Sequence, residues 1–274
     1  LHFRMADVST RYFKELPPLI KASGEAWLKD DDFRLEMTSG EIVLPSGKLG
    51  KLDKGTMAAE DIMVPETVAQ YTFDVTAPTQ AILEFAGHPS LNLIKKSGFD
   101  TTKLMGNAKL SGKLAVPMMK GPPPERVIFS AEAKVRDAAL EGALPGIDIT
   151  DGVVGVTVEK GALEAKGPVK INGVPVELTW RRAAGPGGKQ SAVIEATLDG
   201  EERKKIGVDL GEFLRGPMAV KADLADLADP EGRIDIEADL SKSEMQIAAI
   251  SWSRPPVPKT SATFVYFNKG ERGR

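Results

Sequence analysis

The chain has no cysteine and only two histidines, so the residue types that most often do chemistry are scarce. Without cysteine it has no disulfides, thiolate metal sites or cysteine nucleophiles. His2 and His88 lie far apart in the sequence, and neither has a partner at the spacing of a metal site. No Gly-x-Ser-x-Gly motif provides a serine for His88 to activate. We therefore expect a protein that is not an enzyme, with no catalytic residue, no metal site and no cofactor.

Long apolar runs and an excess of one charge are also missing. No run approaches the length of about 18 apolar residues that a membrane-spanning helix needs. The net charge is −3 with both signs interspersed, which argues against nucleic acid as a partner. The 274 residues are 42% hydrophobic, which excludes a disordered chain and allows one large β domain or two smaller ones. Because the chain begins at Leu1 without a signal peptide, we expect a piece of a longer protein or a processed one.

Two polar segments resemble binding motifs but have simpler explanations. The run Asp30–Asp32 contains potential calcium ligands, yet no glycine lies at the required loop offset, and a hairpin turn explains the run. The loop Gly185–Gly188 lacks the Lys-Ser/Thr pair of a phosphate-binding loop. Carboxylate pairs for glycoside cleavage can assemble from distant strands, but aromatic residues that would stack on sugars make up only 6% of the chain.

Segments in which apolar and polar residues alternate are abundant. In segment 127–136 nearly every second residue is apolar, and the intervening residues are mostly charged. The apolar positions are Val127, Phe129, Ala131, Ala133 and Val135. A period of two is typical of a strand with one apolar and one polar face. Similar segments recur along most of the chain between glycine- and proline-rich turns, so the sequence predicts a mainly β fold.

Helical spacing interrupts this pattern in three short segments, at 78–87, 90–97 and 200–206. Asp199 and Glu202 have the spacing of a capping box for the last of them. The order strand, helix, strand, strand occurs twice, which indicates two copies of one structural unit. The expected divisions are a β-meander over 1–66, a unit over 67–182, a related unit over 183–255, and a C-terminal strand or tail over 256–274.

The apolar strand faces have two interpretations. They either pack against a second sheet in an ordinary sandwich, or they line the inside of a curled antiparallel sheet. Many small residues on these faces favour the second, because a tight concave side has no room for large ones. We therefore expect a β-groove, a curled antiparallel sheet of repeated units with two or three short helices. The side chains expected to line one concave surface are Leu110, Leu114, Val116, Val127, Phe129, Ala131, Val135, Ile234, Ile236 and Leu240.

Several motifs, in their order along residues 5–255, resemble one protein family. The motifs are Leu16-Pro17-Pro18-Leu19, Ser23-Gly24-Glu25-Ala26, Phe33-Arg34-Leu35-Glu36-Met37, the segment from His88 to Ile94 running into 104–110, the segment from Phe129 to Leu140, and the segment from Asn172 to Trp180. They resemble the AsmA-like proteins of the YhdP branch, found in Gram-negative bacteria.

This resemblance implies a periplasmic protein tethered to the inner membrane by a helix outside this sequence. It implies stacked β-groove units whose apolar trough carries the acyl chains of phospholipids between the inner and outer membranes. Phospholipid and the two membranes are the implied partners. Two other functions remain open, namely a structural or assembly β-solenoid without a ligand, and a sugar-binding or sugar-active β protein.

Overall fold

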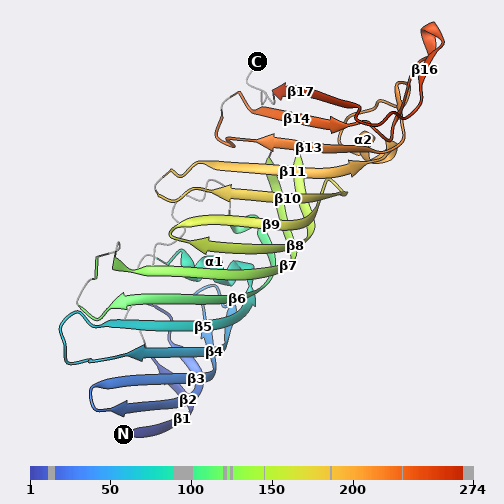
Figure 1. Ribbon diagram of the computed structural model, residues 1–274. Coiled ribbons are helices and arrows are strands. Elements are labelled where there is room, and N and C mark those ends of the chain that lie inside the picture. The colour runs from blue at the N-terminus through green and yellow to red at the C-terminus, as the bar shows by residue number, and fades with distance from the viewer. Residues whose placement is uncertain are drawn as a thin grey trace, which may run out of the picture. The chain divides into compact units, whose positions relative to one another are not determined.

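A computed structural model describes residues 1–11, 16–88, 101–119, 122–123, 126–144, 146–185, 187–229 and 231–267. Within them the protein is mainly β, with one 14-stranded antiparallel sheet, a separate three-stranded sheet and two α-helices (Figure 1). The strands of the large sheet neighbour one another in chain order, from β1 to β11, then β13, β14 and β17. The small sheet has the order β12-β15-β16. No helix among these residues is long and apolar enough to cross a membrane.

The strands account for more than half of the sequence. Their bounds are β1 His2–Thr10, β2 Leu19–Lys29, β3 Asp32–Val43, β4 Leu49–Ala59, β5 Val68–Pro78, β6 Leu104–Pro117, β7 Ile128–Leu144, β8 Ile147–Glu159, β9 Ala162–Ile171, β10 Val174–Arg182, β11 Gln190–Leu198, β12 Leu214–Arg215, β13 Met218–Leu224, β14 Arg233–Asp239, β15 Glu244–Ile247, β16 Trp252–Arg254 and β17 Ser261–Phe267. The helices are α1 Thr79–Ala86 and α2 Gly200–Lys205, with 3-10 turns at Thr101–Lys103 and Ala248–Ile250.

The mainly β prediction is confirmed, and so are the helices expected near 78–87 and 200–206. The helix expected over 90–97 lies outside the described residues. The pair Ser39-Gly40 is typical of turns, but β3 runs through these residues to Val43. Gly40 has no room for a side chain there, because Leu19 Cδ1 lies 2.7 Å from where its Cβ would be. This glycine therefore serves close packing between β2 and β3 rather than a turn.

Contacts between residues divide the chain into two compact units. Unit 1 comprises Leu1–Asp137 with Gly155–Ala162, and unit 2 comprises Ala138–Val154 with Leu163–Arg274. The four divisions expected from the sequence stay a prediction.

Single residues in a left-handed conformation interrupt several strands. Asp7, Lys21, Asp137 and Asp151 have φ between 49° and 53°. Around the first two, the pairing of β1 with β2 and of β2 with β3 shifts register. Such bulges insert one residue into a strand, bend it and increase its twist. They also explain why apolar residues keep to one face when the strict alternation breaks, as at Leu19 and Ala22, which are both buried.

In unit 2, a single arginine attaches α2 to the sheet. Asp199 and Glu202 form the expected capping box, with Asp199 Oδ1 accepting from the Glu202 amide at 2.9 Å. Arg203 is only 1% exposed, and its guanidinium donates to the carbonyls of Leu198 at 3.1 Å, Leu214 at 3.0 Å and Gly216 at 2.8 Å. These carbonyls lie at the end of β11 and around β12, so Arg203 holds three segments together.

Replacing Arg203 by Met should lower the free energy of unfolding by about 2–4 kcal/mol, since three buried carbonyls lose a charged donor. Urea unfolding followed by circular dichroism measures this change. Lys204 on the same helix pairs with the exposed Glu201, so Lys204→Met should cost less than about 1 kcal/mol. Equal losses in the two variants would contradict the role given to Arg203.

Candidate functional site

Strand registers in unit 1 place apolar side chains on one face of the sheet. Tyr71 of β5 is paired with Met57 of β4 and Leu114 of β6, and Leu35 of β3 is paired with Met57 in turn. Paired residues point to the same face, so the whole set follows from the registers. We call this set the unit 1 apolar face: Phe3, Met5, Val8, Leu19, Ala22, Ala26, Leu28, Phe33, Leu35, Met37, Leu52, Met57, Ala59, Ala69, Tyr71, Phe73, Val75, Ala77, Ala108, Leu110, Leu114 and Val116.

Small and large residues on this face differ in burial. The alanines are almost fully buried, with Ala22 at 0% and Ala26 at 1% exposure. Most of the large side chains, among them Phe33, Tyr71 and Leu114, are only half-buried. Inner faces of a β-sandwich interdigitate with a second sheet and bury their large residues. The unit 1 apolar face therefore lacks the burial of a sandwich core in the described part of the chain.

The ring of Phe73 lies close to the backbone of the sheet on this face. The ring of Phe73 covers Gly112, its partner on β6, so closely that a Cβ at Gly112 would collide with it. A ring lying over a cross-strand glycine leaves a shallow, smooth apolar surface. The phenol of Tyr71 lies in the same apolar surroundings, and burial raises its pKa. Its hydroxyl is a polar group on an otherwise apolar surface.

Helix α1 covers one end of the unit 1 apolar face. Its Ala81, Ile82 and Phe85 pack with Leu44 and Ala77 near the end of β5. On its other side, Glu84 accepts hydrogen bonds from the Ser46 hydroxyl and from the Ser46 amide at 3.0 Å. The Ser46 hydroxyl bond is the main cause that lowers the pKa of Glu84. This pair connects α1 to the turn between β3 and β4.

The opposite face of unit 1 is polar and internally paired. Glu25 binds Arg4 and His2, each at 2.9 Å, and the His2 ring stacks on Trp27 with centroids 5.1 Å apart. Farther along the face, Asp53 accepts from the Thr76 hydroxyl at 2.5 Å. The two faces of the sheet therefore differ sharply in polarity.

Unit 2 has the same division into faces. Trp180 of β10 is paired with Ala165 of β9 and Ala192 of β11, and the registers continue to β17. We call the set on this side the unit 2 apolar face: Leu163, Ala165, Val169, Ile171, Val174, Val176, Leu178, Trp180, Ala192, Ile194, Ala196, Leu198, Met218, Val220, Ala222, Leu224, Ile234, Ile236, Ala238, Phe264 and Tyr266.

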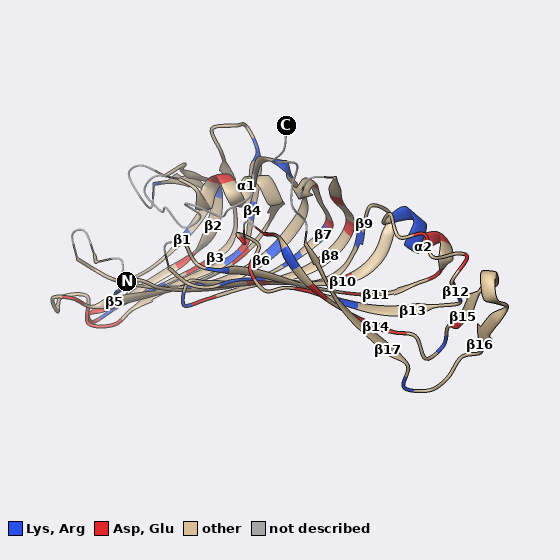
Figure 2. Cartoon of the chain, turned by 90° about the horizontal axis from the view of Figure 1, so that it is seen from above, with Lys and Arg blue, Asp and Glu red and all other residues tan. Residues whose placement is uncertain are grey.

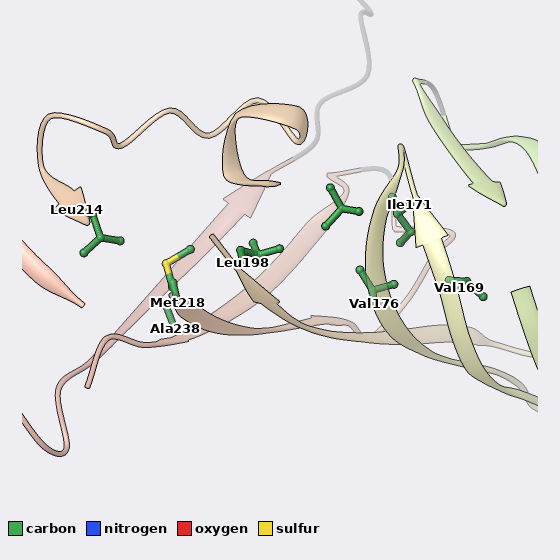
Figure 3. Close-up of a cluster of buried hydrophobic side chains, with 8 residues drawn as sticks. Val169, Ile171, Val176, Leu198, Leu214, Met218 and Ala238 are labelled. Atoms are coloured by element: carbon green, nitrogen blue, oxygen red, sulfur yellow. The ribbon is translucent and has the colours of Figure 1, made fainter. Parts of the chain in front are cut away.

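One end of the unit 2 apolar face is covered. Leu214 of β12 joins a buried cluster with Val176, Leu198 and Met218 (Figure 3). Leu210 and Met245 pack against this cluster. On β17, the edge strand of the large sheet, the large residues stay more accessible, with Phe264 51% and Tyr266 53% exposed. In each unit a short helix therefore follows a strand, β5 or β11, near a covered end of an apolar face. Figure 2 shows charges of both signs on α2.

Most of the expected groove residues form one group in unit 1 and one group in unit 2, and the members of each group lie together. Leu110, Leu114 and Val116 share the unit 1 apolar face. Ile234 and Ile236 share the unit 2 apolar face, and Leu240 packs against its buried cluster. That the two groups line one surface stays a prediction.

The remaining expected residues belong to β7 and its approach. Ala131 and Val135 are buried and Phe129 is half-buried, whereas Ile128 is 68% exposed. Val127 precedes the strand. The alternation in burial agrees with one apolar side on β7, and its sharing of a face with Leu110 stays a prediction.

The sequence-based reasoning did not assign Trp180 or Arg182 to an apolar face. The alternation of Trp180 in phase with Val176 and Leu178 was a usable signal. No group of metal-ligating side chains is present in the described ranges. A comparison of the chain with models of known families, with curated proteins and with solved structures found no match.

The contact between α1 and the β3–β4 turn should depend on pH. Because the pKa of Glu84 is lowered in the fold, its stabilising contribution is present above the ordinary value of 4.5 and is lost as the pH falls through the lower value. The chain has no cysteine of its own, so a nitroxide can be attached at a single cysteine introduced at Ala86. Its mobility in electron paramagnetic resonance should increase as the pH falls from about 6 to about 3.

Ser46→Ala removes the Ser46 hydroxyl bond and should raise the mobility already at pH 6. Glu60→Gln changes an exposed carboxylate elsewhere and should leave the pH response as it is. If the mobility of the label depends on pH in the same way with Ser46 and in the Ser46→Ala variant, the Glu84–Ser46 contact is not the cause of the pH response.

Proposed function

We propose that the chain is a segment of a lipid-transfer protein whose curled sheet holds phospholipid acyl chains on its apolar side. One observation carries the proposal. Most large side chains of the unit 1 apolar face are only half-buried, and α1 covers one end of that face. An apolar surface that the chain leaves accessible often marks a binding site for another apolar molecule.

Acyl chains suit such a surface on energetic grounds. Each methylene moved out of water contributes about 0.8 kcal/mol, so a lipid with two chains gains strongly from an apolar track. An antiparallel sheet provides the track without unpaired backbone groups, because every second side chain points to the same face. The bulges at Asp7 and Lys21 favour strands that bend into a groove, and Asp137 and Asp151 have the same left-handed conformation.

The resemblance to the AsmA-like YhdP branch supports the same function and is the ground for the rest of the proposal. On that ground the protein works in the periplasm, is tethered to the inner membrane, and carries phospholipid toward the outer membrane. The strand–helix order at β5-α1 and at β11-α2 is the pattern expected if two related groove units follow one another. No energy source is encoded in the segment, so transfer is passive.

A structural role without ligand is the second candidate. The buried cluster around Leu198 and Met218 favours it, because that end of the unit 2 apolar face is already an ordinary core. The two functions differ in what contacts the open part of the unit 1 apolar face, which is lipid in the first and only water or protein in the second.

Photocrosslinking in cells tests the proposal. A photoreactive amino acid at Leu114 should give phospholipid adducts, and one at Lys113 should give none, since these neighbours point to opposite faces of β6. Adducts at both positions or at neither would contradict the proposal.

A charge on the same face should block transfer. Leu114→Asp places an unpaired carboxylate where acyl chains pass, at a desolvation cost of several kcal/mol. Transfer of fluorescent phospholipid between vesicles should therefore fall at least tenfold, which corresponds to about 1.4 kcal/mol. Lys113→Asp changes the polar face and should keep transfer near the original rate. Thermal unfolding of both variants separates lost transfer from lost folding.

A further inference from the structure

One charged side chain interrupts the unit 2 apolar face. Arg182 is the last residue of β10 and is paired with Leu163 of β9 and Gln190 of β11. Among the paired positions of β9, β10, β11, β13, β14 and β17, it is the one charged side chain on this face. It lies at the end of β10 opposite to Val174, which belongs to the buried cluster.

Arg182 is half-buried and makes no hydrogen bond or ion pair with any residue that the structure describes. Its neighbour Arg181 points to the polar face, where its Nε donates to Glu164 at 2.6 Å. The two adjacent arginines therefore differ in charge pairing, because Glu164 neutralises Arg181 and no described residue neutralises Arg182. A guanidinium partly withdrawn from water is costly unless an anion or acceptor joins it.

Gln190 adds further donors beside Arg182. Antiparallel partners on one face have Cβ atoms about 5 Å apart, so one ligand can reach both side chains. The Gln190 side chain also makes no hydrogen bond within the described residues. The planar guanidinium fork fits two oxygens of a phosphate, and the amide supplies one more donor.

We propose that Arg182 and Gln190 bind the phosphate of a phospholipid headgroup, with the acyl chains lying on the unit 2 apolar face. This inference rests on the proposed function. The distance along β10 from Arg182 to Val174 is about 27 Å at 3.4 Å per residue. One leaflet of a bilayer core is about 15 Å thick, so acyl chains fit before they reach the covered end.

Trp180 lies one row inward of Arg182, at the level where headgroup and acyl chains would meet. Tryptophan is enriched at that level in membranes because its ring is apolar and its indole N–H is polar. The row of Trp180, Ala165 and Ala192 therefore forms the expected boundary between the headgroup and the chains.

The test compares two lipids with the same acyl chains in the full chain. Dioleoyl phosphatidylglycerol has the phosphate and dioleoylglycerol lacks it, and native mass spectrometry measures the binding of each. Arg182→Gln should weaken phosphatidylglycerol binding about tenfold, equivalent to the loss of one charged hydrogen-bond partner, and leave dioleoylglycerol binding unchanged. Arg181→Gln is the matched control and should change neither.

Other outcomes separate the two proposals. If the original chain binds neither lipid, the proposed function fails and this inference fails with it. If it binds both lipids and Arg182→Gln has no selective effect, only the headgroup site is wrong. Inorganic phosphate that binds in the millimolar range and loses binding in Arg182→Gln, with lipid binding unaffected, would show a free-anion site instead. Unfolding midpoints of both variants identify a loss caused by misfolding.

Discussion

The structure depends on the alternation of side chains along antiparallel strands. Backbone groups of neighbouring strands satisfy one another, so each strand has only two directions for its side chains. A shift of one residue would exchange the faces of a whole strand. The bulges at Asp7 and Lys21 lie where the strand pairing shifts register, and the apolar residues on either side of them keep to one face. One polar and one apolar face in each unit follow from this constraint.

Residue size then decides what the apolar face can do. Alanines near the sheet surface are buried by their neighbours, whereas larger residues such as Phe33 and Leu114 extend from it and remain accessible. One end of each face is covered, by α1 in unit 1 and by Leu210, Leu214 and Met245 in unit 2. Glu84 with Ser46 fastens α1, and Arg203 with three carbonyls fastens α2 beside β12. The covered ends resemble an ordinary core, and the open parts carry the proposed function.

The sequence predicted the features that depend on local pattern. Period-two alternation located most strands of the large sheet, and Asp199 with Glu202 located α2, because capping depends on residues three apart. The small sheet of β12, β15 and β16 was not foreseen, since strands of two to four residues are too short to show a period. The continuation of β3 through Ser39-Gly40 also does not follow from the local sequence, because the close approach of Leu19 comes from a different strand.

The candidate site was predictable from the sequence where it depends on the pattern within a single strand. Leu110, Leu114 and Val116 could be assigned to one face from β6 alone. By contrast, Arg181 and Arg182 are indistinguishable in the sequence, and only the register of β10 with β9 shows that Glu164 neutralises one of them. Side-chain partners across strands are set by register over many residues, which local patterns do not encode.

The central claim is that the open apolar surface holds lipid rather than forming part of a protein core. The most direct measurement is native mass spectrometry of the full chain, purified from cells without detergent. We predict additional masses equal to those of phospholipids, which organic extraction recovers and which Leu114→Asp strongly reduces. A correctly folded chain that shows only the mass of the polypeptide would contradict the account.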